Sequence, residues 1–362
     1  MDIKDLIIVI IGLICGFFLF YRFPKIKKHR PPAKKGVSVV IPCRNEELNI
    51  AELLQNLKEQ TIKPLEIICV NDQSQDETAN IIRQFSNVRL INILNCPNGW
   101  KGKPFALTEG AKAAKGDVIL FLDADVKLQK DAFEYLFSSY SEYGTFSVQP
   151  YHKTINITES MAVFFNLTAI AGTGITLPVK KQRGMFGPVF MIDKMTYFEM
   201  GAHEVVKNCI IEDYALGRHY QKNNLSYTLM LGNSSVSFRM YPESLKSQAQ
   251  GFIKNFSRGF ISASLLTTIL TFVWLMALTA LPVDLISSIV QADTMSIATY
   301  SLFYLIATSH LVIISNQAGK FNILMLILYP IALLWFHIIF IISLFKKIFN
   351  RKVTWKGRKL KI

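Results

Sequence analysis

The chain has 362 residues, of which 51% are hydrophobic, and its net charge is +14. Seven basic residues lie in segment 22–35 and eight in segment 346–361, both free of acidic residues, so the remaining 25 basic residues nearly balance the 26 acidic ones. This distribution excludes a nucleic-acid-binding protein, whose basic residues would cover a folded face. Basic segments beside apolar ones indicate the cytoplasmic ends of membrane helices and favour anionic lipid head groups.

Four apolar segments predict a multi-pass protein of the cell membrane. They lie at 6–23 and at about 262–281, 298–315 and 322–345, and each is close to the ~20 residues that cross a bilayer. We interpret residues 1–24 as a retained transmembrane anchor, because basic residues follow the apolar run and no signal-peptidase site is evident. The basic linker 25–35 then places the next domain in the cytoplasm.

Strands and helices are predicted to alternate through residues 36–242, which we expect to form the catalytic domain. The predicted strands are 37–42, 66–71, 88–94 and 118–122, with helices at 46–60, from Asp76 onward and at 104–115. Such alternation is typical of an α/β domain with a largely parallel sheet and helices on both faces. Ligands of such sheets bind at the carboxyl ends of the strands.

Asp123 and Asp125 directly follow the apolar strand 118–122. Two carboxylates at a strand end can reach one hard cation, and Mg²⁺ or Mn²⁺ binds through a few carboxylates together with phosphate oxygens. A solvated turn would also explain an Asp-x-Asp pair. We predict a Mg²⁺ or Mn²⁺ site that neutralises a diphosphate leaving group.

Two further motifs suit a nucleotide. Asp72 follows strand 66–71 and could accept hydrogen bonds from a base or ribose, while Ser74 or Asp76 could cap the next helix. Lys103 follows a small-residue turn at a helix start, where backbone amides and a cation suit phosphate oxygens. The alternative for Lys103 is an ordinary surface lysine.

Glu212 and Asp213 form a late acidic pair after two apolar residues. One of them could act as general base toward an acceptor. Both could instead be acidic residues of a helix N-terminus, which the helix dipole stabilises. The local sequence leaves both readings open.

In this order, the motifs resemble glycosyltransferase family 2 with a GT-A fold. The family pattern begins with Pro42-Cys-Arg-Asn45-Glu46 and continues through the motifs described above. The resemblance implies a Rossmann-like mixed sheet with one N-terminal and about three C-terminal transmembrane helices. It implies an inverting transfer from a nucleotide sugar, with Asp125 ligating the metal, Asp123 near the ribose or metal shell, and Asp213 or Glu212 as base. The nucleotide-sugar pocket would be lined by Pro42, Glu46, Asp72, Lys103 and Asp123.

Four strings narrow the resemblance to family members that glycosylate a carotenoid carboxylic acid. These are Ser147-Val-Gln-Pro-Tyr-His152, Phe186-Gly-Pro-Val189, Phe238-Arg-Met-Tyr241 and Val353-Thr-Trp-Lys-Gly-Arg358. They imply a hexose, glucose from UDP-glucose, and a lipophilic carotenoid acid in the membrane as acceptor. The last string also resembles ceramide and hopanoid glycosyltransferases.

Two features bear on the product and the acceptor. The Gln-x-x-Arg-Trp motif of processive synthases is absent, and the nearest string is Gln250-Gly-Phe-Ile-Lys254-Asn. The absence of the motif favours addition of one sugar over synthesis of a polymer. An ionised carboxylate acceptor needs little help from a base, whereas a hydroxyl does. Asp213 therefore leaves a ceramide-, hopanoid- or diacylglycerol-like alcohol as the alternative acceptor.

The C-terminal third is expected to meet the membrane. Phe252, Phe256 and Phe260 recur every four residues in segment 243–260, which predicts an interfacial amphipathic helix with core packing as the alternative. Segment 261–345 should hold three transmembrane helices, followed by the basic tail 346–362. Three crossings would put this tail outside, against the positive-inside rule, so either one segment does not cross or the rule fails here.

A membrane transporter or a lipid-binding protein is the non-enzymatic alternative. The four apolar segments contain almost no charge, which makes a poor transport pathway. The acidic motifs of the large domain favour an enzyme.

Overall fold

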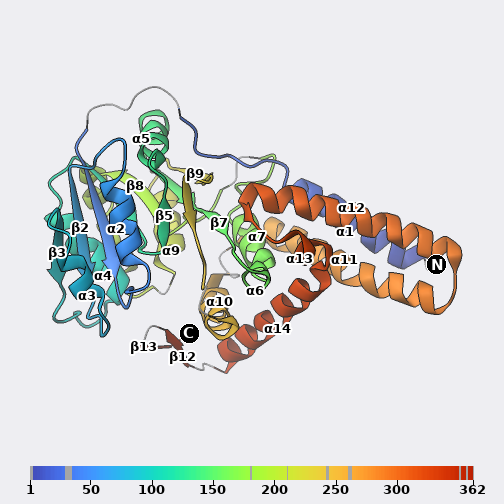
Figure 1. Cartoon of the computed structure of the whole chain (residues 1–362). Helices are drawn as coiled ribbons and strands as arrows, with labels where there is room; N and C mark the ends of the chain where they lie inside the picture. The colour runs from blue at the N-terminus through green and yellow to red at the C-terminus, as the bar shows by residue number, and fades with distance from the viewer. Residues whose placement is uncertain are drawn as a thin grey trace.

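The computed structural model describes residues 3–28, 35–179, 182–209, 211–241, 244–259, 263–349, 352–355 and 358–361. Figure 1 shows a sheet domain beside a group of long helices, with α10 and α7 between them. Residues 29–34 of the predicted basic linker lie outside the described part of the chain. The same holds for Phe260, the side chain of Phe256 and parts of the tail.

The sheet domain contains a mixed sheet in the order β3-β2-β1-β4-β8-β6-β9. Strands β1 (Val37–Cys43), β2 (Glu66–Asn71), β3 (Val88–Asn92) and β4 (Val118–Leu122) are parallel. Strand β8 (Val189–Asp193) runs antiparallel to β4 and β6 (Phe146–Gln149), and β9 (Thr228–Leu231) is parallel to β6. All four predicted strands are confirmed within two residues. Their continuous apolar runs reflect burial on both faces.

Helices cover both faces of this sheet, as the alternating pattern predicts. Side chains of α2 (Ile50–Lys58), α3 (Thr78–Arg83) and α5 (Ala132–Tyr143) share one core with Val39 and Ile41. Side chains of α4 (Gly102–Ala113) and α9 (Glu212–Lys222) share the other core with Val40. Alternate residues of β1 thus enter opposite cores. Helix α8 (Lys194–Glu199) and a 3₁₀ helix (Ala202–Val206) complete the second face.

A smaller sheet, β11-β7-β10-β5, joins the domain to the long helices. Its strands are β5 (Val126–Leu128), β7 (Tyr151–Lys153), β10 (Val236–Phe238) and β11 (Gly319–Lys320). Because β11 directly follows helix α12 (Thr294–Ala318), the end of that helix is hydrogen-bonded into the sheet domain.

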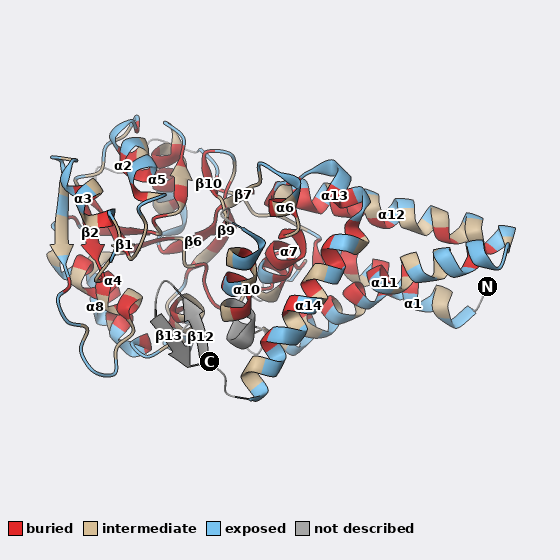
Figure 2. Cartoon of the chain, turned by 60° about the horizontal axis from the view of Figure 1, so that its bottom comes forward, coloured by how far each residue is buried: buried red, intermediate tan, exposed pale blue. Residues whose placement is uncertain are grey.

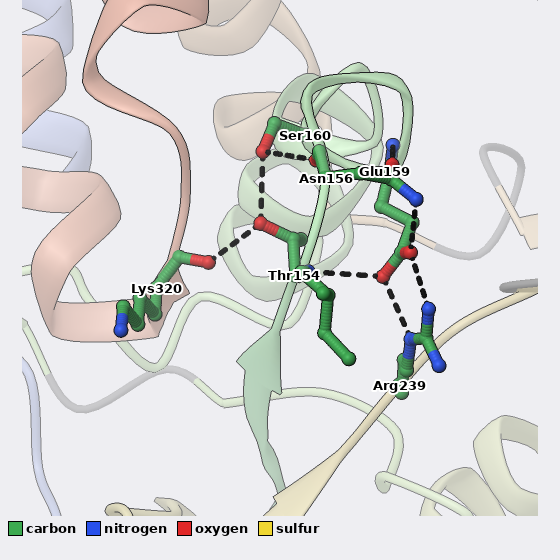
Figure 3. Close-up of polar contacts among 7 residues, drawn as sticks. Thr154, Asn156, Glu159, Ser160, Arg239 and Lys320 are labelled. Carbon is green, nitrogen blue, oxygen red and sulfur yellow. Dashed lines mark hydrogen bonds and ion pairs between the residues drawn. The ribbon is translucent and has the colours of Figure 1, made fainter.

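Side chains reinforce the junction between the smaller sheet and α6 (Ile157–Ser160), as Figure 3 shows. Arg239 donates two hydrogen bonds to the buried Glu159 carboxylate, at 2.6 and 2.8 Å. The hydroxyl of Thr154 donates to the Lys320 carbonyl at 2.8 Å, and Ser160 accepts from the Asn322 amide at 2.9 Å. These contacts hold together segments that lie far apart in the sequence.

Three helices among the described residues are long and apolar enough to cross a membrane. They are α11 (Leu265–Val290), α12 and α14 (Tyr329–Ile348). Large apolar side chains such as Phe272, Leu305 and Leu334 are exposed on them, which is the arrangement expected of helices that face lipid. Figure 2 shows exposed and half-buried residues along the outer sides of these helices. The prediction of about three long apolar helices in the C-terminal third is confirmed by length and composition.

The predicted N-terminal transmembrane helix needs correction. Helix α1 (Ile3–Leu19) has 17 residues and is not among the described helices that are long and apolar enough to span a membrane. It packs along α11 through Gly12 and Gly16. A Cβ atom at Gly12 would collide with Ala277, and one at Gly16 would collide with Trp274, so small residues permit this close approach.

Helix α10 (Leu245–Gly259) occupies the predicted interfacial segment. Phe252 is buried, and its ring stacks on Phe165 of helix α7 (Val163–Gly172) with the centroids 3.8 Å apart. Phe252 therefore packs in the core, which was the alternative to an interfacial position. The tail contains the short strands β12 (Lys352–Trp355) and β13 (Arg358–Lys361), and helix α13 (Ile323–Ile327) lies between β11 and α14.

Candidate active site

A cavity of about 840 Å³ extends from the carboxyl ends of the parallel strands to helices α7 and α11. It brings together every residue that the sequence analysis assigned to the site, because parallel strands present their carboxyl ends at one edge of a sheet. These residues are Pro42, Glu46, Asp72, Lys103, Asp123, Asp125, Glu212 and Asp213.

The loops after β1 and β2 form the first wall. Asp72 is buried, and its backbone amide donates to the Cys43 carbonyl at 2.8 Å. Arg44 donates from Nη1 to the carbonyls of Asp72 and Gln73, at 2.6 and 3.2 Å. This arginine, absent from the predicted site, thereby holds the Asp72 loop against the end of β1.

The side chains after Asp72 order this loop, but the helix cap expected of Ser74 or Asp76 is not observed, because Glu77 is the N-cap of α3 and makes no side-chain cap hydrogen bond. Ser74 accepts from the Asn45 amide at 3.1 Å, and Asp76 accepts from the amide of Thr78 at 3.1 Å at the start of α3. The Thr78 hydroxyl in turn accepts from the Glu46 amide at 2.7 Å. The motif therefore orders the loop, while Asp72 and Glu46 line the cavity.

Lys103 connects two of the acidic motifs. Its Nζ lies 2.8 Å from Asp123 Oδ1 and 3.1 Å from Glu212 Oε1. Burial alone would lower the pKa of Lys103, but the charges of Asp123, Glu212 and Asp213 outweigh it and raise the pKa above its ordinary value. Lys103 is therefore a permanent cation in the cavity wall and is not an ordinary surface lysine.

The Asp-x-Asp pair lies at the end of β4, as predicted. Asp123 is tied to the loop before β8 by its amide, which donates to the Pro188 carbonyl at 2.9 Å. Within the described residues, no three His, Cys, Asp or Glu side chains form a metal-binding cluster. Carboxylate oxygens of Asp125 and Asp123 suit Mg²⁺ or Mn²⁺, but a complete ligand set would also require oxygens from a bound ligand. The residues fit an ion that arrives with phosphate groups.

Glu212 and Asp213 occupy the first turn of α9, so the expected helix-start position is correct. Burial alone would raise the pKa of Glu212, but Lys103 and Lys254 lower it below its usual value. Burial, followed by the charge of Glu212, raises the pKa of Asp213 to about 7. Adjacent carboxyl groups therefore differ in protonation near neutral pH.

The position of Asp213 depends on a glycine. A Cβ atom on Gly187 would lie 2.5 Å from Asp213 Oδ2, so only glycine leaves room for this carboxyl group. The Tyr214 amide donates to Asp213 Oδ1 at 2.8 Å.

The other end of the cavity has a different lining, which the sequence analysis did not assign to the site. Threonines from α7 and α11 line it together with apolar and aromatic side chains: Thr168, Thr173, Thr267, Thr268, Thr271, Met240, Tyr241 and Ala263. Lys254 of α10 also lines the cavity, although its sequence position indicated only the polar face of an amphipathic helix. Its place within the string Gln250-Gly-Phe-Ile-Lys254-Asn was the signal that the sequence offered.

Comparison with known proteins identifies the family. The profile described as Glycosyl transferase family 2 matches residues 38–188. The 4,4'-diaponeurosporenoate glycosyltransferase of Staphylococcus aureus strain USA300 is 32% identical over 98% of this chain and 96% of its own length. The protein of that name from strain MRSA252 is also 32% identical, with the same coverage. The chain belongs to glycosyltransferase family 2.

This family 2 glycosyltransferase also shares its fold with a solved structure. A mannosyltransferase from Pyrobaculum calidifontis, in complex with GDP-Man and Mn²⁺, superposes with a TM-score of 0.53 at 14% identity. The match covers 96% of this chain and 98% of the mannosyltransferase. The shared fold therefore includes the long helices as well as the GT-A-like sheet domain.

Proposed function

We propose that this enzyme transfers one hexose, glucose from UDP-glucose, to a carotenoid carboxylic acid dissolved in the cell membrane, with its catalytic domain in the cytoplasm. The observation that carries the proposal is the continuous cavity between the carboxylate cluster and helices α7 and α11. A water-soluble donor can bind at one end while a lipophilic acceptor arrives at the other. The 32% identity with enzymes named for a carotenoid acid supports this acceptor.

The donor fits the end of the cavity formed by the sheet. Pro42, Glu46 and Asp72 would contact the nucleoside, and Lys103 lies where its charge can reach phosphate oxygens. The mannosyltransferase with the same fold is in complex with a nucleotide sugar and Mn²⁺. Held by Asp125, with Asp123 beside it, a divalent ion would stabilise the negative charge that develops on the leaving diphosphate.

The proposed transfer is a single displacement with inversion. An acceptor oxygen forms a bond to the anomeric carbon as the bond from that carbon to the diphosphate oxygen breaks, and UDP leaves with the electron pair. A carboxylic acid with a pKa near 4 is already ionised at neutral pH, so this acceptor loses no proton to the enzyme. Asp213 would border the reacting groups without needing to act as a base.

A hydroxyl-bearing lipid is the second candidate acceptor, because one observation favours it. The pKa of Asp213 is raised, first by burial and then by Glu212, to about 7, which is the value expected of an efficient general base near neutral pH. In that reaction Asp213, or Glu212 in its place, would remove the proton of a ceramide-, hopanoid- or diacylglycerol-like alcohol.

The proposal is tested with purified full-length enzyme in lipid nanodiscs, incubated with labelled nucleotide sugars and a carotenoid acid. We expect mass spectrometry to detect one hexose added to the acid, with UDP-glucose as the preferred donor. Turnover of an alcohol lipid without turnover of any carotenoid acid would contradict the acceptor assignment. No transfer of any sugar to any lipid would contradict the proposed function as a whole.

Metal dependence has a separate test. Excess EDTA should abolish transfer and Mn²⁺ or Mg²⁺ should restore it, while Asp125→Asn should lower the binding of Mn²⁺ in the presence of UDP, measured by electron paramagnetic resonance. Glu109→Gln, which alters a partly exposed carboxylate on α4, serves as the control. Full activity in excess chelator would rule out the metal role.

A further inference from the structure

Helix α10 holds one lysine in the cavity wall. Helix α14 fixes its position through two hydrogen bonds: the Trp335 indole donates to Gln248 Oε1 at 3.0 Å, and Ser343 donates to the Ile253 carbonyl at 3.2 Å. Phe252 and Ile253, which precede Lys254, are buried. Lys254 therefore extends into the cavity from a helix whose orientation is fixed by its packing.

The basic side chains of the cavity come from two different places. Among the described residues, Arg44, Lys101 and Lys103 belong to the sheet end, where the donor is proposed to bind. Lys254 comes from α10, in the segment that leads directly into α11 and the threonine-lined end. A cation in this place is close to the acceptor end as well as to the carboxylates.

An anionic acceptor needs such a cation. The negative charges of Asp123, Glu212 and Asp213 act on both Lys103 and Lys254, and all five residues line the cavity. Lys103 lies at the sheet end of the cavity, 2.8 Å from Asp123 and 3.1 Å from Glu212. A carboxylate brought next to Asp213 would meet uncompensated negative charge unless a second lysine offset it, because charges in an enclosed site are weakly screened.

Resting on the proposed function, we propose that Lys254 binds the ionised carboxylate of the acceptor and so determines the preference for an acid over an alcohol. One carboxylate oxygen is held by the lysine while the other attacks the anomeric carbon, and the electron pair of the broken bond leaves with UDP. The product is a neutral ester. The ester carries no negative charge for Lys254 to bind, and this favours release of the product into the membrane.

The test compares Lys254→Met, which keeps the length of the side chain and removes its charge, with Lys254→Arg, which keeps the charge. For Lys254→Met we expect the KM of the carotenoid acid to rise roughly 10- to 100-fold, as when one partner of an enclosed charge pair is truncated. The KM of UDP-glucose should change less than about twofold. Lys254→Arg should recover most of the acceptor affinity. Lys246→Met, an exposed lysine on the same helix, is the matched control.

A binding measurement separates recognition from turnover. Carotenoids quench tryptophan fluorescence, so binding of the acid and of its methyl ester can be compared without any donor. Wild-type enzyme should bind the acid more tightly than the ester, and Lys254→Met should bind both with equal affinity. If the variant is unstable, Lys254→Gln gives the same comparison.

Three results would overturn the inference. A higher KM for the donor with an unchanged KM for the acid would assign Lys254 to the diphosphate. Identical behaviour of Lys254→Met and Lys246→Met would leave Lys254 without a role. Equal binding of acid and ester by the wild type would remove the basis for recognition. Each of these outcomes leaves sugar transfer by the wild type intact, whereas absence of any transfer would instead contradict the proposed function.

Discussion

Glu212 and Asp213 are neighbours in one helical turn, yet their surroundings give them different properties. Glu212 pairs with Lys103 at 3.1 Å and stays ionised, since Lys103 and Lys254 overcome the effect of burial on its pKa. Asp213 receives a backbone hydrogen bond from Tyr214 but is buried beside the negative charge of Glu212. Two adjacent acids can therefore perform different tasks, because one is neutralised by a lysine and the other is regulated by pH.

The pH dependence of transfer should distinguish the two acceptor classes. Burial and Glu212 raise the pKa of Asp213 to about 7, so this carboxyl group is mostly protonated below pH 7 and mostly ionised above it. The charges of Asp123, Glu212, Lys103 and Lys254 act on this carboxyl group. With a carotenoid acid, we expect kcat/KM to fall as pH rises through about 7, because ionised Asp213 repels the acceptor carboxylate.

With an alcohol acceptor the sign is opposite, because only ionised Asp213 can accept the hydroxyl proton, and kcat/KM should rise through the same pH range. Asp213→Asn provides the control. It should remove the pH dependence at little cost in rate for the acid, and should cost about 10²–10⁴-fold for the alcohol. A rate with the acid that increases with pH and is lost in Asp213→Asn would contradict the carboxylate mechanism.

At the level of secondary-structure elements, the smaller sheet joins the sheet domain to the long apolar helices. Strand β10 carries Phe238 into the cavity wall and is followed by Arg239, whose pair with Glu159 fixes α6 beside it. Strand β7 pairs with both β10 and β11. The position of the cavity wall therefore depends on contacts outside the cavity.

Glu159→Gln should loosen this link. Breaking a buried ion pair by changing one partner costs about 3–5 kcal/mol, and because Arg239 is partly exposed we expect on the order of 2–3 kcal/mol here. The midpoint of thermal unfolding in detergent should fall by several degrees. Glu109→Gln, which breaks the exposed pair with Lys112, should change it little. Equal effects of the two substitutions would show that the Glu159 pair contributes no more than a surface pair.

The contact between α1 and α11 gives a second prediction at this scale. Gly16→Leu would drive a large side chain into the buried Trp274, and overpacking of this kind costs roughly 1–3 kcal/mol. The thermal midpoint should fall, while Ile14→Leu at an exposed position of the same helix should leave it unchanged. An unchanged midpoint in Gly16→Leu would mean that α1 does not pack on α11 as described.

At the scale of the whole molecule, the position of α14 bears on which side of the membrane holds the basic tail. Its first residue, Tyr329, stacks on Tyr304, whose hydroxyl donates to the Ile327 carbonyl at 2.7 Å. Tyr304 lies 14 residues before the end of α12, which corresponds to ~21 Å along the helix. Helix α14 thus begins partway along the α11–α12 pair and returns to α10 and the sheet domain, as Figure 1 shows.

We therefore expect the C-terminal tail on the same side of the membrane as the sheet domain. An epitope tag after residue 362 should be digested by protease in inverted vesicles and protected in intact spheroplasts. A tag inserted at Ala292, between α11 and α12, should give the reverse pattern. Digestion of the C-terminal tag in intact spheroplasts would show that α14 crosses completely.

The sequence predicted those parts of the structure that depend on local patterns. Apolar runs located β1, β2, β3 and β4, and their parallel arrangement brought Asp72, Asp123 and Lys103 to one edge. Lys254 escaped prediction, because its place in the cavity depends on how α10 packs against α7 and α14. The pairing of β11 with β7 was equally hidden, since it joins residues far apart in the chain and β11 has only two residues.

The hydrogen bonds between β11 and β7 have a consequence for which lipids the enzyme can modify. They connect the end of α12 to the smaller sheet through backbone hydrogen bonds, so we expect the proposed site of sugar transfer to stay at a fixed distance from the bilayer. A reactive group must rise to that level while its tail remains dissolved in the hydrocarbon below. Under the proposed function, chemically equivalent carboxylates on shorter or longer chains should therefore differ in reactivity according to the depth at which the membrane holds them.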